Sequence, residues 1–490
     1  MLATAPTETG VFNDLRSFIA ACQEMDDWRA IDGADWDLEI GALTEATAEL
    51  ITEPPLLLFD NIKGYPAGYR VVSLLLASYR RGALALGLPL DRPRSELMRL
   101  AARKIANAES ILPATVGSGP VMEYVLDGSD IDLFRFPVPR FHAEDGGRYI
   151  GTGDTLINRD PDSGFVNVGT YRMQLHEPNL LGLWMSPGQQ GRQICQQYWD
   201  RGESCPVVAT FGGDPLLFVV SHTKIPWGRS ELELAGGLRG RPIEVVEGPL
   251  TGLPIPAHAE IAIEGEVPPP QEQARDEGPF GEWPGYYSGG TRGTGEAQPV
   301  IRVRRLYHRG NPILMNEAPL WPGAKQGLSI PAGMLWDQLE SAGIQDIVGV
   351  AQHTPYMIVV AIRQRYAGHA KQTGHAALSC SAAARNGRYV VVVDEDIDPT
   401  DMKEVLWAME TRVDPARDIE LVDGCWSTPL DPRMPPANRE SHEHTNSRAI
   451  FYAVRPYAWR DKFPQVSRSP RDLRQSVIDK YRSVLPFPRL

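Results

Sequence analysis

The chain has 490 residues, of which 42% are hydrophobic and 23% are charged, and its formal net charge is −13. This balance is ordinary for a soluble globular protein, and the length predicts two or three domains. The negative charge argues against nucleic acid or an anionic membrane as the main partner, which leaves small molecules. No apolar run reaches the length of a membrane span and the N-terminus lacks the features of a signal peptide, so a cytoplasmic protein is expected.

The N-terminal part, residues 1–115, is predicted to be an α/β lobe. Apolar residues from Leu15 to Cys22 recur at helical spacing behind a capping Asn13 or Asp14, which predicts an opening helix. Further elements are expected as helices at 39–51, 71–80 and 95–106 and as a buried strand at 56–59.

From Val121 the pattern changes to short alternating segments separated by Gly, Pro and Asp. A hairpin is predicted from residues 149–158 and 165–175 around a turn at 159–164. More strands are expected at 181–185, 206–211 and 216–221. Several strands at this spacing favour a barrel or a sandwich.

After residue 312 the pattern becomes strand, helix, strand, helix, which predicts a second α/β lobe. Strands are expected at 347–351, 357–363 and 389–393, and helices at 366–385, 401–411 and 472–481. A strap rich in Pro and Arg precedes the last helix. A terminal helix reached in this way packs either on its own chain or on another subunit.

The loop EGPFGEWPGYYSGG at 277–290 places Glu277 and Glu282 five positions apart. Its glycines and proline predict a structured turn that can aim both carboxylates at one point. Beside Phe280, Trp283 and Tyr286, such a pair suits general acid and base chemistry, because burial raises the pKa of one carboxyl. The alternative is a surface turn with two solvated glutamates.

The second arm of the predicted hairpin carries Asn167 and Arg172. In a regular strand Asn167 and Tyr171 share one face, while Val168, Thr170 and Arg172 share the other. A bulge is therefore required to bring Asn167 and Arg172 together.

Other clusters weigh less. Five scattered cysteines predict reduced, packed thiols and no disulfide framework. His442 and His444 have the spacing of two zinc ligands on one strand face, but without a third ligand nearby a polar loop is favoured.

Six segments together resemble the UbiD-type decarboxylase family. NVGTYR at 167–172, PGQQG at 187–191, SELELAGGLRG at 230–240 and EGPFGE at 277–282 occur in the family's order and at its approximate spacing. VVVVDEDIDP at 390–399 and VLWAMETRVDP at 405–415 extend the resemblance over nearly all of the chain.

The resemblance implies an α/β plus β fold of three parts. These are an N-terminal α/β lobe (1–115), a central split β-barrel cofactor domain of flavin-reductase type (116–311), and a C-terminal α/β lobe with an oligomerisation tail (312–490). It also implies a homodimer or higher homo-oligomer.

The resemblance further implies prenylated FMN, bound with a divalent metal (Mn2+ or Mg2+) and potassium. The implied metal ligands are Asn167, Gln190 and Glu231, and the implied catalytic residues are Arg172, Glu277 and Glu282. The implied cofactor-binding residues are Asn167, Thr170, Tyr171, Arg172, Gln189, Gln190, Ser221, Lys224 and Glu231.

The chain departs from the family pattern at two places. Gln190 stands where many members have a histidine ligand, and its neutral carbonyl oxygen suits a hard cation better than a soft one. A lysine that many members carry before the strand at 389–393 is absent, with Ser381 to Ala383 in that neighbourhood.

The chemistry explains why a cofactor is needed. Loss of CO2 from an unsaturated carbon leaves a carbanion that no side chain can delocalise, so a cofactor must serve as electron sink. Arg172 suits binding of the substrate carboxylate or alignment of the acids. Glu282 suits proton delivery, since Trp283 and Phe280 would desolvate it, and Glu277 would hold Arg172.

The predicted activity is reversible, non-oxidative decarboxylation of an aromatic or heteroaromatic acid of benzoate, pyrrole or fused-ring type, such as a phenazine carboxylate. Trp283 and Trp321 are expected to line the substrate pocket, and a flavin prenyltransferase is expected to supply the cofactor. The alternatives are a flavin-dependent redox enzyme on a split barrel and a cofactor-free binding or scaffold protein of the same fold.

Overall fold

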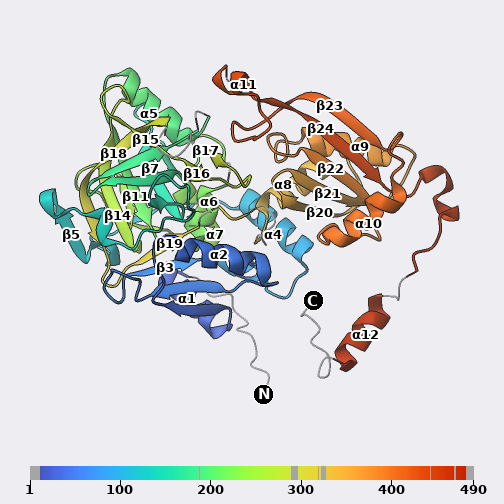
Figure 1. The fold of residues 1–490 in the computed structure, drawn as a ribbon, viewed down its shortest axis with the longest axis horizontal. Coiled ribbons are helices and arrows are strands. Elements are labelled where there is room, and N and C mark those ends of the chain that lie inside the picture. Colours follow the sequence, from blue (N-terminus) through green and yellow to red (C-terminus); the bar gives the residue numbers. More distant parts are fainter. Residues whose placement is uncertain are drawn as a thin grey trace.

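The computed structural model describes residues 12–186, 188–223, 225–288, 296–317, 319–321, 327–441, 443–467 and 471–481. The fold is mixed α/β, with a curled barrel-like sheet packed against the N-terminal α/β lobe and the C-terminal α/β lobe to one side (Figure 1). In the described residues no helix is both long enough and apolar enough to cross a lipid bilayer.

The N-terminal lobe is a four-stranded sheet, in the order β1-β2-β3-β19, with helices packed around it. Asp14 caps α1 by accepting a hydrogen bond from the Ser17 backbone N at 2.9 Å, and the predicted apolar face is buried. Its strands are β1 (Trp28–Asp32), β2 (Leu56–Asp60), β3 (Arg70–Ser73) and β19 (Ile313–Asn316). Its helices are α1 (Leu15–Glu24), α2 (Glu39–Leu50), α3 (Tyr79–Ala85) and α4 (Arg94–Asn107).

The helix expected at 71–80 is wrong. Residues 70–73 form strand β3, which pairs in parallel with β19, and the helix begins only at Tyr79. Val71 and Val72 are buried in this sheet, where β-branched side chains pack well. The decisive partner comes from the far end of the barrel sequence, past the predicted domain boundary at 311, so local periodicity could not reveal it.

The central sheet curls until its two ends meet. Its main strand order is β6-β9-β10-β18-β14-β11-β7-β8, with β5 and β15 paired to β18. Only residues 152–153 separate β6 from β7, and only residues 170–171 separate β8 from β9. Because these pairs lie at opposite ends of the strand order, the two short links hold the ends of the curled sheet close together, as in a split barrel.

The elements of this region have the following bounds. The sheet contains β5 (Tyr124–Asp127), β6 (Tyr149–Gly151), β7 (Asp154–Arg159), β8 (Val166–Gly169), β9 (Arg172–Glu177), β10 (Leu180–Trp184), β11 (Cys205–Phe211), β14 (Ile261–Val267), β15 (Ala274–Glu277) and β18 (Glu296–His308). Smaller sheets contain β4 (Ala114–Thr115), β12 (Glu244–Glu247) and β13 (Pro254–Pro256), and β16 (Phe280–Gly281) with β17 (Tyr287–Ser288). The helices are α5 (Gln190–Asp200), α6 (Pro215–Ser221), α7 (Glu231–Arg239) and the short η1 (Pro120–Met122), η2 (Gly128–Asp130) and η3 (Leu133–Arg135).

The strand expected at 216–221 is also wrong, because this segment is helix α6. A short, continuous apolar run is compatible with either a buried strand or a buried helix. The start of the segment decides between them. Asp214 accepts a hydrogen bond from the Leu216 backbone N at 3.0 Å, and Pro215 occupies the first turn, where its missing N–H costs nothing.

The C-terminal lobe is a five-stranded sheet, in the order β20-β21-β22-β24-β23, with flanking helices. Its strands are β20 (Ile347–Thr354), β21 (Met357–Ile362), β22 (Tyr389–Asp394), β23 (Ile419–Trp426) and β24 (Thr445–Ala453). Its helices are α8 (Ile330–Ser341), α9 (His369–Ser379), α10 (Met402–Arg412), α11 (Pro436–Glu440), η4 (Tyr457–Lys462) and α12 (Arg471–Tyr481). The strands and helices predicted here are confirmed, apart from shifts at their ends.

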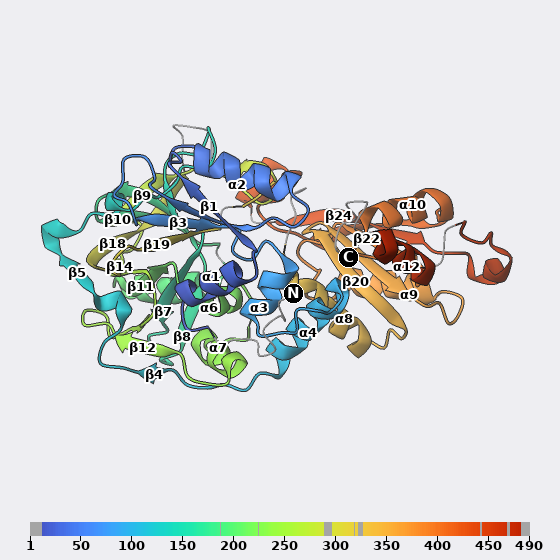
Figure 2. The same ribbon diagram turned by 90° about the horizontal axis from the view of Figure 1, so that it is seen from below.

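Helices α4 and α8 join the lobes, and Figure 2 shows them between the barrel and the C-terminal sheet. Met98 of α4 belongs to the hydrophobic core of the C-terminal lobe. Arg103 adds an ion pair from its Nε to Asp337 of α8 at 3.1 Å. Helix α12 stands apart from the rest of the ribbon (Figure 1).

Candidate active site

A buried arginine lies between the two glutamates of the 277–290 loop. Arg172, the first residue of β9, donates from Nε and Nη2 to the two carboxylate oxygens of Glu277, each at 2.7 Å. Its Nη1 donates to Glu282 Oε1 and, at 3.2 Å, to Ser288 Oγ. The relative exposures of these side chains are 6% for Arg172, 1% for Glu277 and 9% for Glu282. The two glutamates are therefore not solvated surface groups.

The fold explains this meeting. Strand β15 delivers Glu277, and the chain then turns at Gly278, whose φ of +92° favours glycine. Phe280 pairs with Ser288 in the β16–β17 hairpin. The Glu282 backbone N donates to the Tyr286 carbonyl at 3.0 Å, which fixes Glu282 at the tip. The loop thus directs both acids at the start of β9.

The surroundings separate the proton affinities of these groups. The guanidinium carbon of Arg172 lies 4.8 Å from the ring centre of Trp184 and 4.9 Å from that of Phe280. Burial alone would lower the pKa of Arg172, but Glu277 and Glu282 raise it above its ordinary value. Burial raises the pKa of Glu282, although Arg172 acts in the opposite direction. The site therefore contains a lasting cation and a carboxyl that holds its proton more firmly than usual.

A cavity of about 760 Å³ lies beside this group and receives walls from both the barrel and the C-terminal lobe. Its volume is within the range of small-molecule sites, about 300–1,000 Å³. The barrel side carries most of the predicted cofactor-binding residues, namely Asn167, Thr170, Tyr171, Gln189, Gln190, Ser221 and Glu231. Tyr171 lines the cavity and Arg172 follows it directly, so the acid pair lies next to the cavity wall without lining it.

Three of these residues, Asn167, Gln190 and Glu231, carry the oxygen atoms that the predicted metal site requires. Glu231 opens α7 and accepts a hydrogen bond from the Val168 backbone N at 2.7 Å, which holds its carboxylate beside Asn167. Burial raises the pKa of Glu231 to about 7, and no cation of the described part of the chain pairs with it. Gln190 donates from Nε2 to the Ile225 carbonyl at 3.0 Å, and its Oε1 has no hydrogen-bond partner among the residues that the structure describes.

A cation fits this oxygen set. A buried carboxylate without a positive partner is costly, and oxygen ligands suit a hard divalent ion. Among the described residues no group of three or more His, Cys, Asp or Glu side chains gathers in metal-binding geometry. The candidate site therefore depends on the two amide oxygens in addition to Glu231.

Of the other residues predicted to bind cofactor or substrate, some line the cavity and some do not. Thr170 and Ser221 share a hydrogen bond of 2.8 Å between their hydroxyls, but Ser221 ends helix α6 and not a strand. Lys224 lies outside the described residues. Neither tryptophan predicted for the substrate pocket is among the residues that line this cavity. Trp283 packs on Tyr356 of the C-terminal lobe with ring centres 5.3 Å apart, and Trp321 is exposed.

The single strand predicted at 165–175 is wrong, because it is divided into β8 and β9 at residues 170–171, and no bulge lies in the described stretch between Asn167 and Arg172. β8 ends at Gly169 and β9 begins at Arg172, so Thr170 and Tyr171 form one of the links that hold the ends of the curled sheet together. The alternation of faces restarts across this link. Asn167 therefore lines the cavity from β8, while Arg172 binds the acid pair from β9.

Sequence reasoning missed the wall from the C-terminal lobe. Arg385, Trp426, Ser427 and His444 line the cavity opposite the barrel. These residues lie in separate segments, and only the arrangement of the lobes brings them to the cavity. His442, the other histidine considered for zinc, lies outside the described residues.

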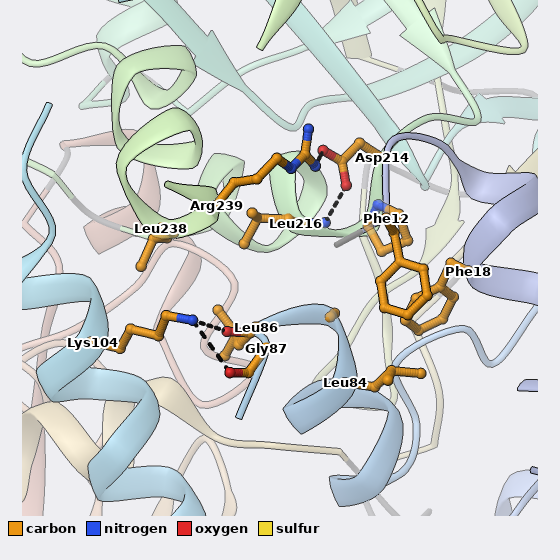
Figure 3. Close-up of a pocket in the computed structure, with 12 residues that line it drawn as sticks. Phe12, Phe18, Leu84, Leu86, Gly87, Lys104, Asp214, Leu216, Leu238 and Arg239 are labelled. Carbon is orange, nitrogen blue, oxygen red and sulfur yellow. Dashed lines mark hydrogen bonds and ion pairs between the residues drawn. The ribbon is translucent and has the colours of Figure 1, made fainter. Parts of the chain in front are cut away.

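A second cavity, of about 110 Å³, lies where the N-terminal lobe meets the barrel (Figure 3). Lys104 Nζ donates to the Leu86 carbonyl at 2.6 Å, and burial lowers the pKa of Lys104. Asp214 pairs with Arg239 across the cavity wall. These charged groups are satisfied within the chain, so nothing in this cavity requires a ligand.

Three family models match the chain in the order of its lobes. The 3-octaprenyl-4-hydroxybenzoate carboxy-lyase Rift-related domain (UbiD) matches residues 114–320. The N-terminal domain of the same family matches residues 19–101, and its C-terminal domain matches residues 329–453. The fold is therefore that of a carboxy-lyase.

Known proteins agree with these models. The phenolic acid decarboxylase of Streptomyces sp. (strain D7) is 31% identical over 91% of this chain and 93% of its own length. The open form of Sedimentibacter hydroxybenzoicus vanillic acid decarboxylase has a TM-score of 0.81 at 27% identity, covering 97% of this chain and 100% of that chain. An evolved dimeric form of HmfF from Pelotomaculum thermopropionicum, a UbiD-class enzyme in complex with prFMN, has a TM-score of 0.79 at 26% identity, covering 96% and 100%.

The chain belongs to the UbiD family of decarboxylases.

Proposed function

We propose that this enzyme catalyses reversible, non-oxidative decarboxylation of an aromatic or heteroaromatic acid with prenylated FMN. The observation that carries the proposal is the buried group of Arg172, Glu277 and Glu282 beside the 760 Å³ cavity. A lasting cation attracts a carboxylate, and a carboxyl of raised pKa can give a proton to carbon.

The cofactor, when bound, supplies the electron sink that the carbanion needs. Asn167, Gln190 and Glu231 would hold a divalent metal, Mn2+ or Mg2+, that offsets the charge of the flavin phosphate. Potassium is proposed to accompany the metal. The proposal is supported by the unpaired, buried Glu231 and by the prFMN complex of the UbiD-class relative.

The side chains of Arg172, Glu277 and Glu282 are proposed to orient the substrate and transfer the proton. Arg172 orients the substrate carboxylate, and Glu277 holds Arg172 through its two hydrogen bonds. The bond between the ring carbon and the carboxylate breaks, CO2 leaves, and Glu282 gives its proton to the same carbon. In the reverse direction Glu282 takes that proton back as CO2 adds.

The substrate class is proposed as a planar acid of benzoate, pyrrole or fused-ring type, such as a phenazine carboxylate. Trp283 and Trp321 are proposed to contact it. The aromatic and phenolic acids named for the relatives support an aromatic ring. The C-terminal lobe, through Trp426, adds a further aromatic side chain to the cavity.

The test is to produce the chain together with a flavin prenyltransferase and to measure CO2 release from a panel of aryl acids. We expect a modified-flavin spectrum and turnover of at least one acid. Reduction of the bound flavin by a nicotinamide, without CO2 release, would favour a redox enzyme. Protein that remains free of flavin would favour a binding or scaffold role.

A further inference from the structure

One buried amide, that of Asn158, contacts the proposed metal ligand Asn167 without lining the cavity. Asn158 lies in β7, directly opposite Asn167 of β8, and is fully buried. Its side chain lies between Asn167 and the start of α5, which carries Gln190. A buried polar side chain in a barrel wall requires hydrogen-bond partners, and the identity of these partners is informative.

The partners fix which way the Asn158 amide points. Its Nδ2 donates to the Gly191 backbone carbonyl at 3.0 Å, and the sulfur atoms of Cys195 and Cys205 lie 3.6 and 4.0 Å from the same nitrogen. A carbonyl can only accept. A flipped amide would place oxygen against that carbonyl, so the nitrogen must face Gly191.

The orientation of Asn158 then fixes that of Asn167. With Nδ2 turned to Gly191, Asn158 presents Oδ1 to Asn167, and Asn167 Nδ2 donates to it at 3.2 Å. The other atom of the Asn167 amide, Oδ1, is left for the cavity. Only an oxygen can bind a cation, because the amide NH2 has no free lone pair for a metal.

We propose that Asn158 is a positioning residue for the metal site. The Gly191 carbonyl orients the Asn158 amide, and the Asn158 amide in turn orients that of Asn167. Asn167 therefore offers oxygen and not nitrogen to a divalent cation. The same hydrogen bond to Gly191 ties the strand that carries Asn167 to the helix that carries Gln190. Asn158 does not touch the metal, and its role rests on the metal site of the proposed function.

The test measures Mn2+ binding to flavin-free protein by electron paramagnetic resonance. In Asn158→Leu the new side chain has a similar volume but no polar atoms, so Asn167 loses the hydrogen bond that orients its amide. The expected loss of Mn2+ affinity is about 10- to 100-fold, the usual effect of removing a group that orients a metal ligand. Asn158→Asp keeps an oxygen facing Asn167, and its protonated form can still donate to the Gly191 carbonyl, so it should retain more affinity than Asn158→Leu.

The matched control is Thr155→Val, in the same strand. It removes a buried hydrogen bond of 2.7 Å between Thr155 and Thr210 that does not involve Asn167. The control should bind Mn2+ like the wild type and show a comparable change in melting temperature. If Asn158→Leu does not fold, Asn158→Ala carries the same expectation.

Two results would overturn the role of Asn158. Unchanged Mn2+ affinity in the Leu or Ala variant would remove it while leaving the proposed metal site intact. Absence of Mn2+ binding in the wild type would remove the metal site and this role with it. CO2 release by the loaded wild-type enzyme is measured separately, so failure of the proposed function can be recognised independently.

Discussion

Glu282→Gln tests the proton donor most directly. Gln keeps the shape of the side chain and offers Arg172 Nη1 and Ser288 the same oxygen acceptor, so the contacts of the site are retained. Burial raises the pKa of Glu282, so the neutral carboxyl forms more readily here than in water. Replacing it with a neutral amide should therefore cost little stability.

The effect on the reaction should be large. Removing a general acid slows a reaction by about 10²- to 10⁴-fold, which corresponds to about 3–5 kcal/mol in the barrier. Glu282 does not line the cavity, so flavin and substrate should still bind. CO2 release and hydrogen–deuterium exchange at the product carbon should fall together.

The pH profile gives a second measure. Glu282 holds its proton below its raised pKa and loses it above, so proton delivery should fall as pH rises through that pKa. The descending limb should be missing in Glu282→Gln. The matched control is Glu264→Gln, since Glu264 is also a buried glutamate but accepts a hydrogen bond from Tyr307 Oη at 2.5 Å in the barrel wall.

Near-normal exchange in Glu282→Gln with normal flavin content would refute the argument. The role would then pass to another group, with Tyr286 and Glu277 the next to test. A loss of flavin in this variant would instead show that Glu282 contributes to cofactor binding.

Two other predictions concern the metal and the assembly. Glu231→Ala should yield folded protein with little bound flavin by absorbance, and full occupancy would contradict the metal assignment. In the wild type, Mn2+ affinity measured by titration should fall as pH drops below about 7, because protons then compete for Glu231; a flat profile would contradict this. The segment 455–490 is expected to contact another subunit, because Leu473 and Val477, four residues apart on α12, are exposed. Removal of residues 468–490 should reduce the assembly seen by sedimentation, and a monomeric full-length chain at micromolar concentration would remove the prediction.

Local sequence signals determined much of this protein. The cap and apolar periodicity of α1, the hairpin of β7 and β8, and the alternating elements of the C-terminal lobe all depend on contacts within a few residues. The motifs at 167–172 and 277–282 likewise supplied the residues of the buried ion-pair group. The two motifs lie far apart in the sequence, so the sequence identified the residues of the ion-pair group but not how they are arranged in space.

Tertiary structure decided the rest. β3 is a strand because β19 returns to pair with it, and the ends of the curled sheet lie close together because two short links join them. The break between β8 and β9 restarts the alternation of faces, so that Asn167 lines the cavity while Arg172 binds the acid pair. The direction of the Asn167 amide depends on a carbonyl of Gly191, more than twenty residues away. Such long-range contacts produce no periodic pattern in the sequence. The two partners are far apart along the chain, and only the tertiary fold brings them together.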